Sequence, residues 1–158
     1  MPSEVLGTAA LWVALAAATL IVLARRPQAA QLKHVVGPAL IVLALQALHF
    51  SEELTTAFYQ RFPERLGLAP WSVEFFVVFN LIWLALWLLA VWLARAGRAP
   101  AYAAIMLWFL GIAAIGNGIA HPILAVLARG YFPGLITSPF LGLAGLFLVR
   151  ALLSAPRA

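Results

Sequence analysis

Charged residues are scarce in this chain of 158 residues, since ten are basic, five are acidic, and together they make up 9% of the sequence. A soluble domain usually carries about a quarter. Hydrophobic residues account for 65% and the mean hydropathy is +1.03, so a soluble globule would lack a polar surface. Intrinsic disorder is excluded because disordered chains are rich in charge and poor in apolar residues. The composition indicates a chain that folds in a membrane.

Cysteine is absent, and all five acidic residues are glutamates. Without cysteine there is no disulfide framework, no Cys-ligated zinc, no thiol catalysis and no covalent c-type haem. The net charge of +5 and the pI near 10.8 would suit a nucleic-acid-binding protein. The basic residues are spread over helix ends rather than gathered together, so membrane topology explains them better. We expect no nucleic-acid partner.

Hydropathy predicts five apolar spans, because a bilayer core needs about 20 apolar residues in a helix. The spans cover residues 5–24, 35–60, 71–94, 102–128 and 139–153. Pro63 and Pro70 are expected to bracket a short loop after the second span. The sequence therefore predicts an all-α, polytopic transmembrane helix bundle that forms a single integral-membrane domain over residues 1–158.

Lysine and arginine predict the orientation, because basic residues near helix ends stay on the cytoplasmic side. One side of the five spans carries Arg25, Arg26, Lys33, Arg95, Arg98, Arg150 and Arg157. The other side carries Arg61, Arg65 and Arg129. We therefore expect the N-terminus outside, the C-terminus in the cytoplasm, and a location in a bacterial cytoplasmic (inner) membrane.

The second span contains the densest group of polar residues, and ionisable residues inside spans mark candidate functional sites. His49 and Glu53 are four residues apart and therefore share one helix face, with Glu52 beside it. Gln46, three residues before His49, extends the same polar stripe.

The third and fourth spans carry Asn80, Asn117 and His121 at a matching depth. Counted from the outer ends of the helices at 1.5 Å per residue, these residues and the second-span cluster lie about 10–17 Å deep. We expect three helices to present their polar groups in one layer of the outer leaflet. Gly116 and Gly118 should leave room beside Asn117 for a buried cavity.

The string His49-x-x-Glu52-Glu53, in a small apolar chain with several spans, resembles the HXXEE domain family of membrane proteins. The resemblance also covers residues further along the chain, namely Asn80, Asn117, His121, Tyr131, Pro133, Gly134 and Thr137. It implies a polytopic membrane protein of largely uncharacterised activity, and it supports the site without naming a reaction.

The first functional hypothesis is a metal-dependent enzyme. An imidazole and a carboxylate four residues apart on a helix can ligate one cation, as in zinc sites with the sequences H-x-x-E-H or H-E-x-x-H. By this analogy His49, Glu53 and His121 bind a divalent metal. Two imidazoles and one carboxylate with an open position suit zinc or iron(II).

The remaining polar residues are the candidate catalytic groups of this hypothesis. Glu52 would act as general base, and Asn80 and Asn117 would orient a ligand or polarise a substrate carbonyl. The substrate would be a lipid or another apolar small molecule or peptide, because it must reach a site inside the membrane. Hydrolysis is the simplest reaction for such a site.

Three other interpretations are open. Two glutamates and a histidine in a low-dielectric cavity could form a metal-free acid/base pair of an isomerase or cyclase that acts on an isoprenoid-type lipid. The same residues could form the proton or cation site of a transport or binding protein, alone or as a homo-oligomer. They could also be a structural network in which they pair with Arg61 or with one another near the interface. The stretch Tyr131–Gly134 suits a turn or a lid over the outer cavity.

Overall fold

The computed structural model describes residues 2–26 and 28–154, and these residues form helices joined by short connections, without a strand. In chain order the helices are α1 (Ser3–Gly7), α2 (Ala9–Arg25), α3 (Ala29–Leu32), the 3-10 turn Lys33–Val35, α4 (Val36–Thr55), α5 (Phe58–Arg65), α6 (Val73–Ala96), α7 (Pro100–Ala128) and α8 (Ser138–Ser154). The all-α class is confirmed. Arg157, used above for orientation, lies outside the described residues.

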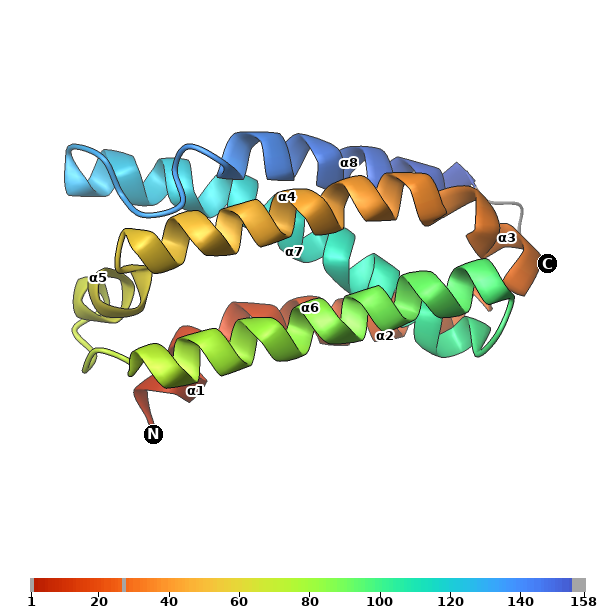
Figure 1. Cartoon of the computed structure of the whole chain (residues 1–158), viewed down its shortest axis with the longest axis horizontal. Helices are drawn as coiled ribbons and strands as arrows, with labels where there is room; N and C mark the ends of the chain where they lie inside the picture. Colours follow the sequence, from red (N-terminus) through yellow and green to blue (C-terminus); the bar gives the residue numbers. More distant parts are fainter. Residues whose placement is uncertain (1, 27, 155–158) are drawn as a thin grey trace.

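Helix α7 is the centre of the bundle and contacts α2, α4, α6 and α8. In Figure 1 it runs obliquely across the bundle, from the end of α6 toward α8, which packs against α4. Its long buried stretch, from Ala103 to Ala114, is made largely of alanine and large apolar residues. Pro100 stands in the first turn of α7, where its missing N–H is not needed.

Three helical stretches are long and apolar enough to cross a bilayer, namely Ala29–Thr55, Val73–Ala96 and Pro100–Ala128. Helices α2 and α8 are apolar but shorter. Large apolar side chains cover the outside of the bundle, including Val13 at 70% and Val126 at 77% exposure. A soluble protein rarely exposes such extensive apolar surface, so the chain has the character of a membrane protein.

Two expected helices are interrupted, and both breaks shape the site. The helix expected over residues 35–60 ends at Thr55, because Ala57 adopts a left-handed conformation with φ 59° and starts α5 in a new direction. Pro63 lies inside α5, so the expectation that it bounds a loop was wrong. The first span is divided at Thr8 into α1 and α2.

Glycines bring α7 and α8 into close contact. A Cβ added to Gly118 would lie 2.7 Å from the Cα of Gly142, and one added to Gly145 would lie 2.8 Å from the Cβ of Ala114. Small residues allow helix backbones to approach in this way in membranes. Gly118 therefore packs against α8 rather than leaving room beside Asn117, whereas Gly116 has open space around its Cα and lines a cavity.

Candidate functional site

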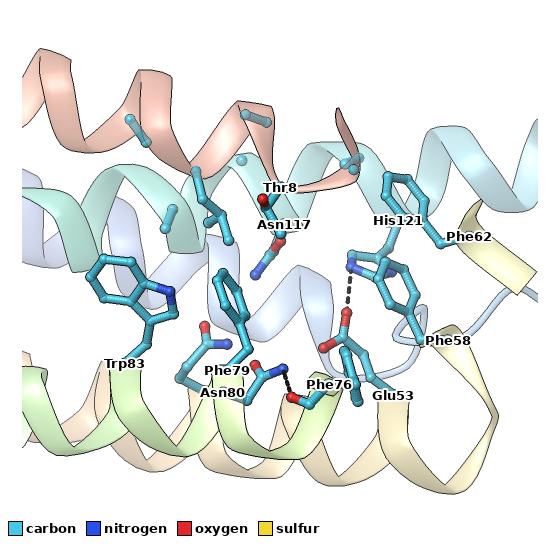
Figure 2. A pocket seen from close by; sticks show the side chains of 18 of the residues that line it. Thr8, Glu53, Phe58, Phe62, Phe76, Phe79, Asn80, Trp83, Asn117 and His121 are labelled. Carbon is cyan, nitrogen blue, oxygen red and sulfur yellow. Dashed lines mark hydrogen bonds and ion pairs between the residues drawn. The ribbon is translucent and has the colours of Figure 1, made fainter. Parts of the chain in front are cut away.

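Three of the expected site residues converge where α4 and α7 meet. The Nε2 atoms of His49 and His121 are 3.2 Å apart, and Glu53 Oε1 lies 3.5 Å from the first and 3.4 Å from the second. All three side chains are buried, and Figure 2 shows Glu53 and His121 facing each other. We call these three residues the His–Glu–His cluster. Its ligand atoms are close enough to hold one metal ion.

The other ring nitrogen of each histidine, Nδ1, has a hydrogen-bond partner outside the cluster. His121 Nδ1 lies 2.6 Å from the Pro133 carbonyl oxygen, which can only accept, so Nδ1 carries the proton. His49 Nδ1 lies 2.8 Å from Thr137 Oγ1, whose hydroxyl donates to Glu52 Oε2 at 2.6 Å. Thr137 therefore accepts from His49. In the neutral imidazoles both Nε2 lone pairs then point into the cluster.

Glu52 faces the connection between α7 and α8 rather than the cluster. Its carboxylate accepts hydrogen bonds from the Tyr131 hydroxyl, the Ile136 N–H, the Thr137 N–H and the Thr137 hydroxyl. Burial raises the pKa of the Tyr131 phenol above its ordinary value, and its hydrogen bond to Glu52 raises it further. Glu52 is not among the residues that line the neighbouring cavity.

Residues 129–137, which we call the covering segment, lie directly on the cluster. Gly134 has φ +85°, and a Cβ on it would collide with the His121 ring and lie 2.8 Å from His49 Cε1. Only glycine combines this backbone conformation with so close an approach. The turn expected near Tyr131–Gly134 is present and lies on the cluster. No residue of the covering segment is among those that line the adjoining cavity, so the lid over the cavity stays a prediction.

Arg61 contacts the covering segment and not the cluster. Its guanidinium donates to the Tyr131 carbonyl at 3.3 Å and lies 5.5 Å from the centre of the Phe132 ring. Within the described residues Arg61 forms no ion pair with Glu52 or Glu53, so the pairing of the cluster with Arg61 was wrong. The other form of the structural network, in which the histidines and Glu53 pair with one another, agrees with the distances of 3.5 and 3.4 Å.

A cavity of about 380 Å³ adjoins the cluster and is lined by residues of α1, α2, α4, α5, α6 and α7. Glu53 and His121 contribute to the lining. Aromatic rings form much of the remaining wall, namely Trp71 and Trp87 together with five that Figure 2 labels, Phe58, Phe62, Phe76, Phe79 and Trp83. The exposed lining residues Val13, Gly116 and Ala120 show that the cavity reaches the surface between α2 and α7. Its opening therefore faces sideways from the bundle.

Asn80 and Asn117 line this cavity, as does Gln46. Asn80 donates from Nδ2 to the Phe76 carbonyl of its own helix at 2.9 Å. The structure thus places Asn80 and Asn117 in one cavity with Glu53 and His121, and Glu52 apart from them.

Sequence reasoning missed several residues that shape the site. Phe58 packs on the His121 ring with the ring centres 5.3 Å apart, and the break at Ala57 brings it there. Trp83 and Trp87 are buried in the core of the bundle and also line the cavity. The spacing of Phe76, Trp83 and Trp87, seven and four residues apart on one face of α6, was the available signal.

The fold and the site define the chain as a membrane-type helix bundle that buries a His–Glu–His cluster beside an apolar cavity. A family model described as "protein of unknown function with HXXEE motif" matches residues 40–149. This match covers more than half of the chain, which belongs to the HXXEE family. Neither a curated protein nor a solved structure gave a match.

Proposed function

We propose that this protein is a metal-dependent membrane hydrolase whose divalent metal is held by His49, Glu53 and His121. The spacing of the three ligand atoms carries the proposal. Zinc lies about 2.0–2.1 Å from nitrogen and oxygen ligands, so tetrahedral ligands lie about 3.3–3.4 Å from one another. The three distances in the cluster are 3.2, 3.4 and 3.5 Å.

The hydrogen bonds to Nδ1 of the two histidines support the same proposal. The Pro133 carbonyl and the Thr137 hydroxyl fix the tautomers in which both Nε2 atoms are free to ligate. Metal-binding histidines usually have such partners at the second nitrogen. Two imidazoles and one carboxylate suit zinc or iron(II).

Hydrolysis follows from what surrounds the cluster. A divalent metal would supply a Lewis acid. Both contacts of Glu53 use Oε1, which leaves Oε2 to accept a proton from water in the cavity. Asn80 and Asn117 offer amide donors to a substrate carbonyl. In this proposal Glu52 holds the covering segment, and Glu53 is therefore the general base in place of Glu52. The apolar cavity suits a lipid or an apolar peptide.

A metal-free acid/base site is the second candidate, and the histidine pair favours it. A separation of 3.2 Å between the Nε2 atoms is also that of an N–H···N hydrogen bond, which forms if one imidazole is protonated. A proton shared in this way next to Glu53 would serve an isomerase or cyclase that acts on an isoprenoid-type lipid. Transport would need polar groups beyond the cluster on both sides, and the described cavity wall is mostly apolar.

We also propose that the N-terminus lies outside, the C-terminus in the cytoplasm, and the protein in a bacterial cytoplasmic membrane. Helices α2 and α6 end, and α7 begins, at one end of the bundle in Figure 1. The described basic residues at these ends are Arg25, Arg26, Arg95 and Arg98. Their number supports a cytoplasmic position for this end.

The metal content of the purified protein tests the proposed function. Elemental analysis should find about one zinc or iron ion per chain, and His49→Ala and Glu53→Ala should each remove it, because two ligands rarely retain the metal of a three-ligand site. His34→Ala and Glu74→Ala are matched controls, since both side chains are exposed and distant in sequence from the cluster. A folded protein that is active without metal would contradict the proposal and favour the acid/base site.

A further inference from the structure

We propose that the cavity binds a neutral, single-chain amphiphile that bears a hydroxyl or an amide group. In the bound state this group meets Gln46, about one helical turn from the His–Glu–His cluster, and the apolar chain lies between α2 and α6. The inference names the substrate class of the proposed hydrolase and rests on that function for its chemistry, although binding can be measured independently.

Unpartnered polar atoms are the first observation. Three buried side-chain atoms of the described residues lack a hydrogen-bond partner, and all three belong to cavity-lining residues, namely Gln46, Trp71 and Trp87. A buried polar group without a partner is destabilising. Gln46 is only 5% exposed and its free atom is the carbonyl oxygen Oε1, which needs a donor. A ligand with an O–H or N–H group supplies it.

The position of Gln46 on α4 indicates where the O–H or N–H group of the ligand binds. It stands three residues before His49 on α4, and Asn117 stands four residues before His121 on α7. Each amide is therefore about one turn, or 5 Å, along its helix from a cluster histidine. With Asn80 from α6 these residues form an amide layer beside the cluster, and Figure 2 shows Asn80 and Asn117 directed into the cavity.

The charge of the wall excludes an anion. Of the residues described around the cavity, Glu53 is the only one with a formally charged side chain, and no lysine or arginine is among them. At Gln46 a carboxylate or phosphate would have no proton to donate to the free Oε1 and would meet no lysine or arginine, which is costly. Hydroxyl and amide groups remain as the polar part of the ligand.

The length and the opening of the cavity indicate a single apolar chain. From His121 to Ile112 the lining extends nine residues along α7, about 14 Å, and on the opposite side it follows α6 to Trp87. The opening at Val13, Gly116 and Ala120 lies between helices that expose apolar side chains. A lipid-like molecule can enter there from the bilayer.

Quenching of tryptophan fluorescence by brominated probes tests this inference in the full-length protein in nanodiscs. The probe 12-bromododecan-1-ol should quench saturably, because its bromine reaches Trp83 and Trp87, and dodecan-1-ol should reverse the effect. Exposed Trp92 gives only a non-saturable background. In protein treated with a chelator, where no metal attracts the carboxylate, we expect 12-bromododecanoic acid and 1-bromododecane to bind at least about tenfold more weakly than the alcohol. The acid is charged and has no proton to donate to Gln46, and 1-bromododecane has no donor.

Two variants with matched controls locate the binding. Gln46→Leu should weaken the binding of 12-bromododecan-1-ol about tenfold and leave the affinity for 1-bromododecane unchanged. Gln60→Leu, at an exposed glutamine, should change neither affinity. Gly116→Leu should abolish saturable quenching by filling the mouth of the cavity. Gly37→Leu should not, although both glycines have open space for a side chain.

Equal saturable quenching by all three probes, or equal affinities of Gln46→Leu and Gln60→Leu for the alcohol, would overturn the inference. Failure of the proposed function gives a different result. In that case the parent protein contains no stoichiometric metal, yet 12-bromododecan-1-ol still quenches saturably and Gln46→Leu still lowers the affinity for it.

Discussion

At the scale of single residues, Thr137 fixes the tautomer of His49. Its hydroxyl has one proton, which goes to Glu52 Oε2, and its oxygen accepts from His49 Nδ1. A hydrophobic residue of the same shape cannot hold the imidazole in this tautomer. The tautomer of His49, on which the proposed metal site relies, thus depends on a residue 88 positions away in the sequence.

Replacing Thr137 by valine should weaken metal binding about 10–100-fold, the usual effect of losing a partner behind a ligand. The affinity is measured by competition with a chelator of known affinity. Thr137→Ser should retain the parent affinity because it retains the hydroxyl.

The control for this change is Thr55→Val, which removes an exposed hydroxyl that bonds only within α4. Equal metal affinities for Thr137→Val and Thr55→Val would show that the hydrogen bond to His49 does not matter.

At the scale of elements, the covering segment is held by one carboxylate. Glu52 accepts four hydrogen bonds from it, and hydrogen bonds to a charged group contribute about 1.5–3 kcal/mol each. The segment in turn supplies the Pro133 carbonyl to His121. The two adjacent glutamates of the motif therefore have different partners.

Glu52→Gln should loosen the covering segment, because an amide nitrogen replaces one of the accepting oxygens. Hydrogen exchange at the Ile136 and Thr137 amides should become at least about tenfold faster, as expected when one such bond is lost. The exposed residue Glu64 provides the control variant Glu64→Gln. Unchanged protection in Glu52→Gln would contradict this role.

The contact between α7 and α8 gives a second prediction at this scale. Gly118→Ala should lower the free energy of unfolding by about 1–3 kcal/mol, because its methyl group would press on the backbone of Gly142. Gly116→Ala, two residues away with open space, should raise it by about 0.5–1 kcal/mol. Denaturation in one detergent compares the two variants, and equal effects would contradict the packing described.

At the scale of the whole molecule, the distribution of basic residues predicts the orientation in the membrane. Alkaline phosphatase is active only outside the cytoplasm, so a fusion after Gly67 should be active and a fusion at the C-terminus inactive. Green fluorescent protein should fluoresce only in the C-terminal fusion. An active phosphatase at the C-terminus would reverse the proposed orientation.

Elements with a strong signal could be predicted from the sequence. Long apolar runs between arginines indicated the helices, and α7 follows its prediction from Tyr102 to Ala128. The end of α4 was missed because the left-handed conformation of Ala57 has no local signal, since alanine rarely adopts it. The helical spacing of His49 and Glu53 indicated a shared face, and their common depth with His121 indicated a meeting point.

The sequence by itself indicated that the chain folds in a membrane, because its apolar fraction does not depend on the details of the fold. It also indicated the polar residues of the site, because ionisable groups are costly in lipid in any fold. Only the tertiary structure decided which glutamate faces the histidines. Glu52 and Glu53 are adjacent in sequence, but successive residues on a helix point about 100° apart. Their roles therefore depend on what packs against each face, which is the covering segment for Glu52 and His121 of α7 for Glu53.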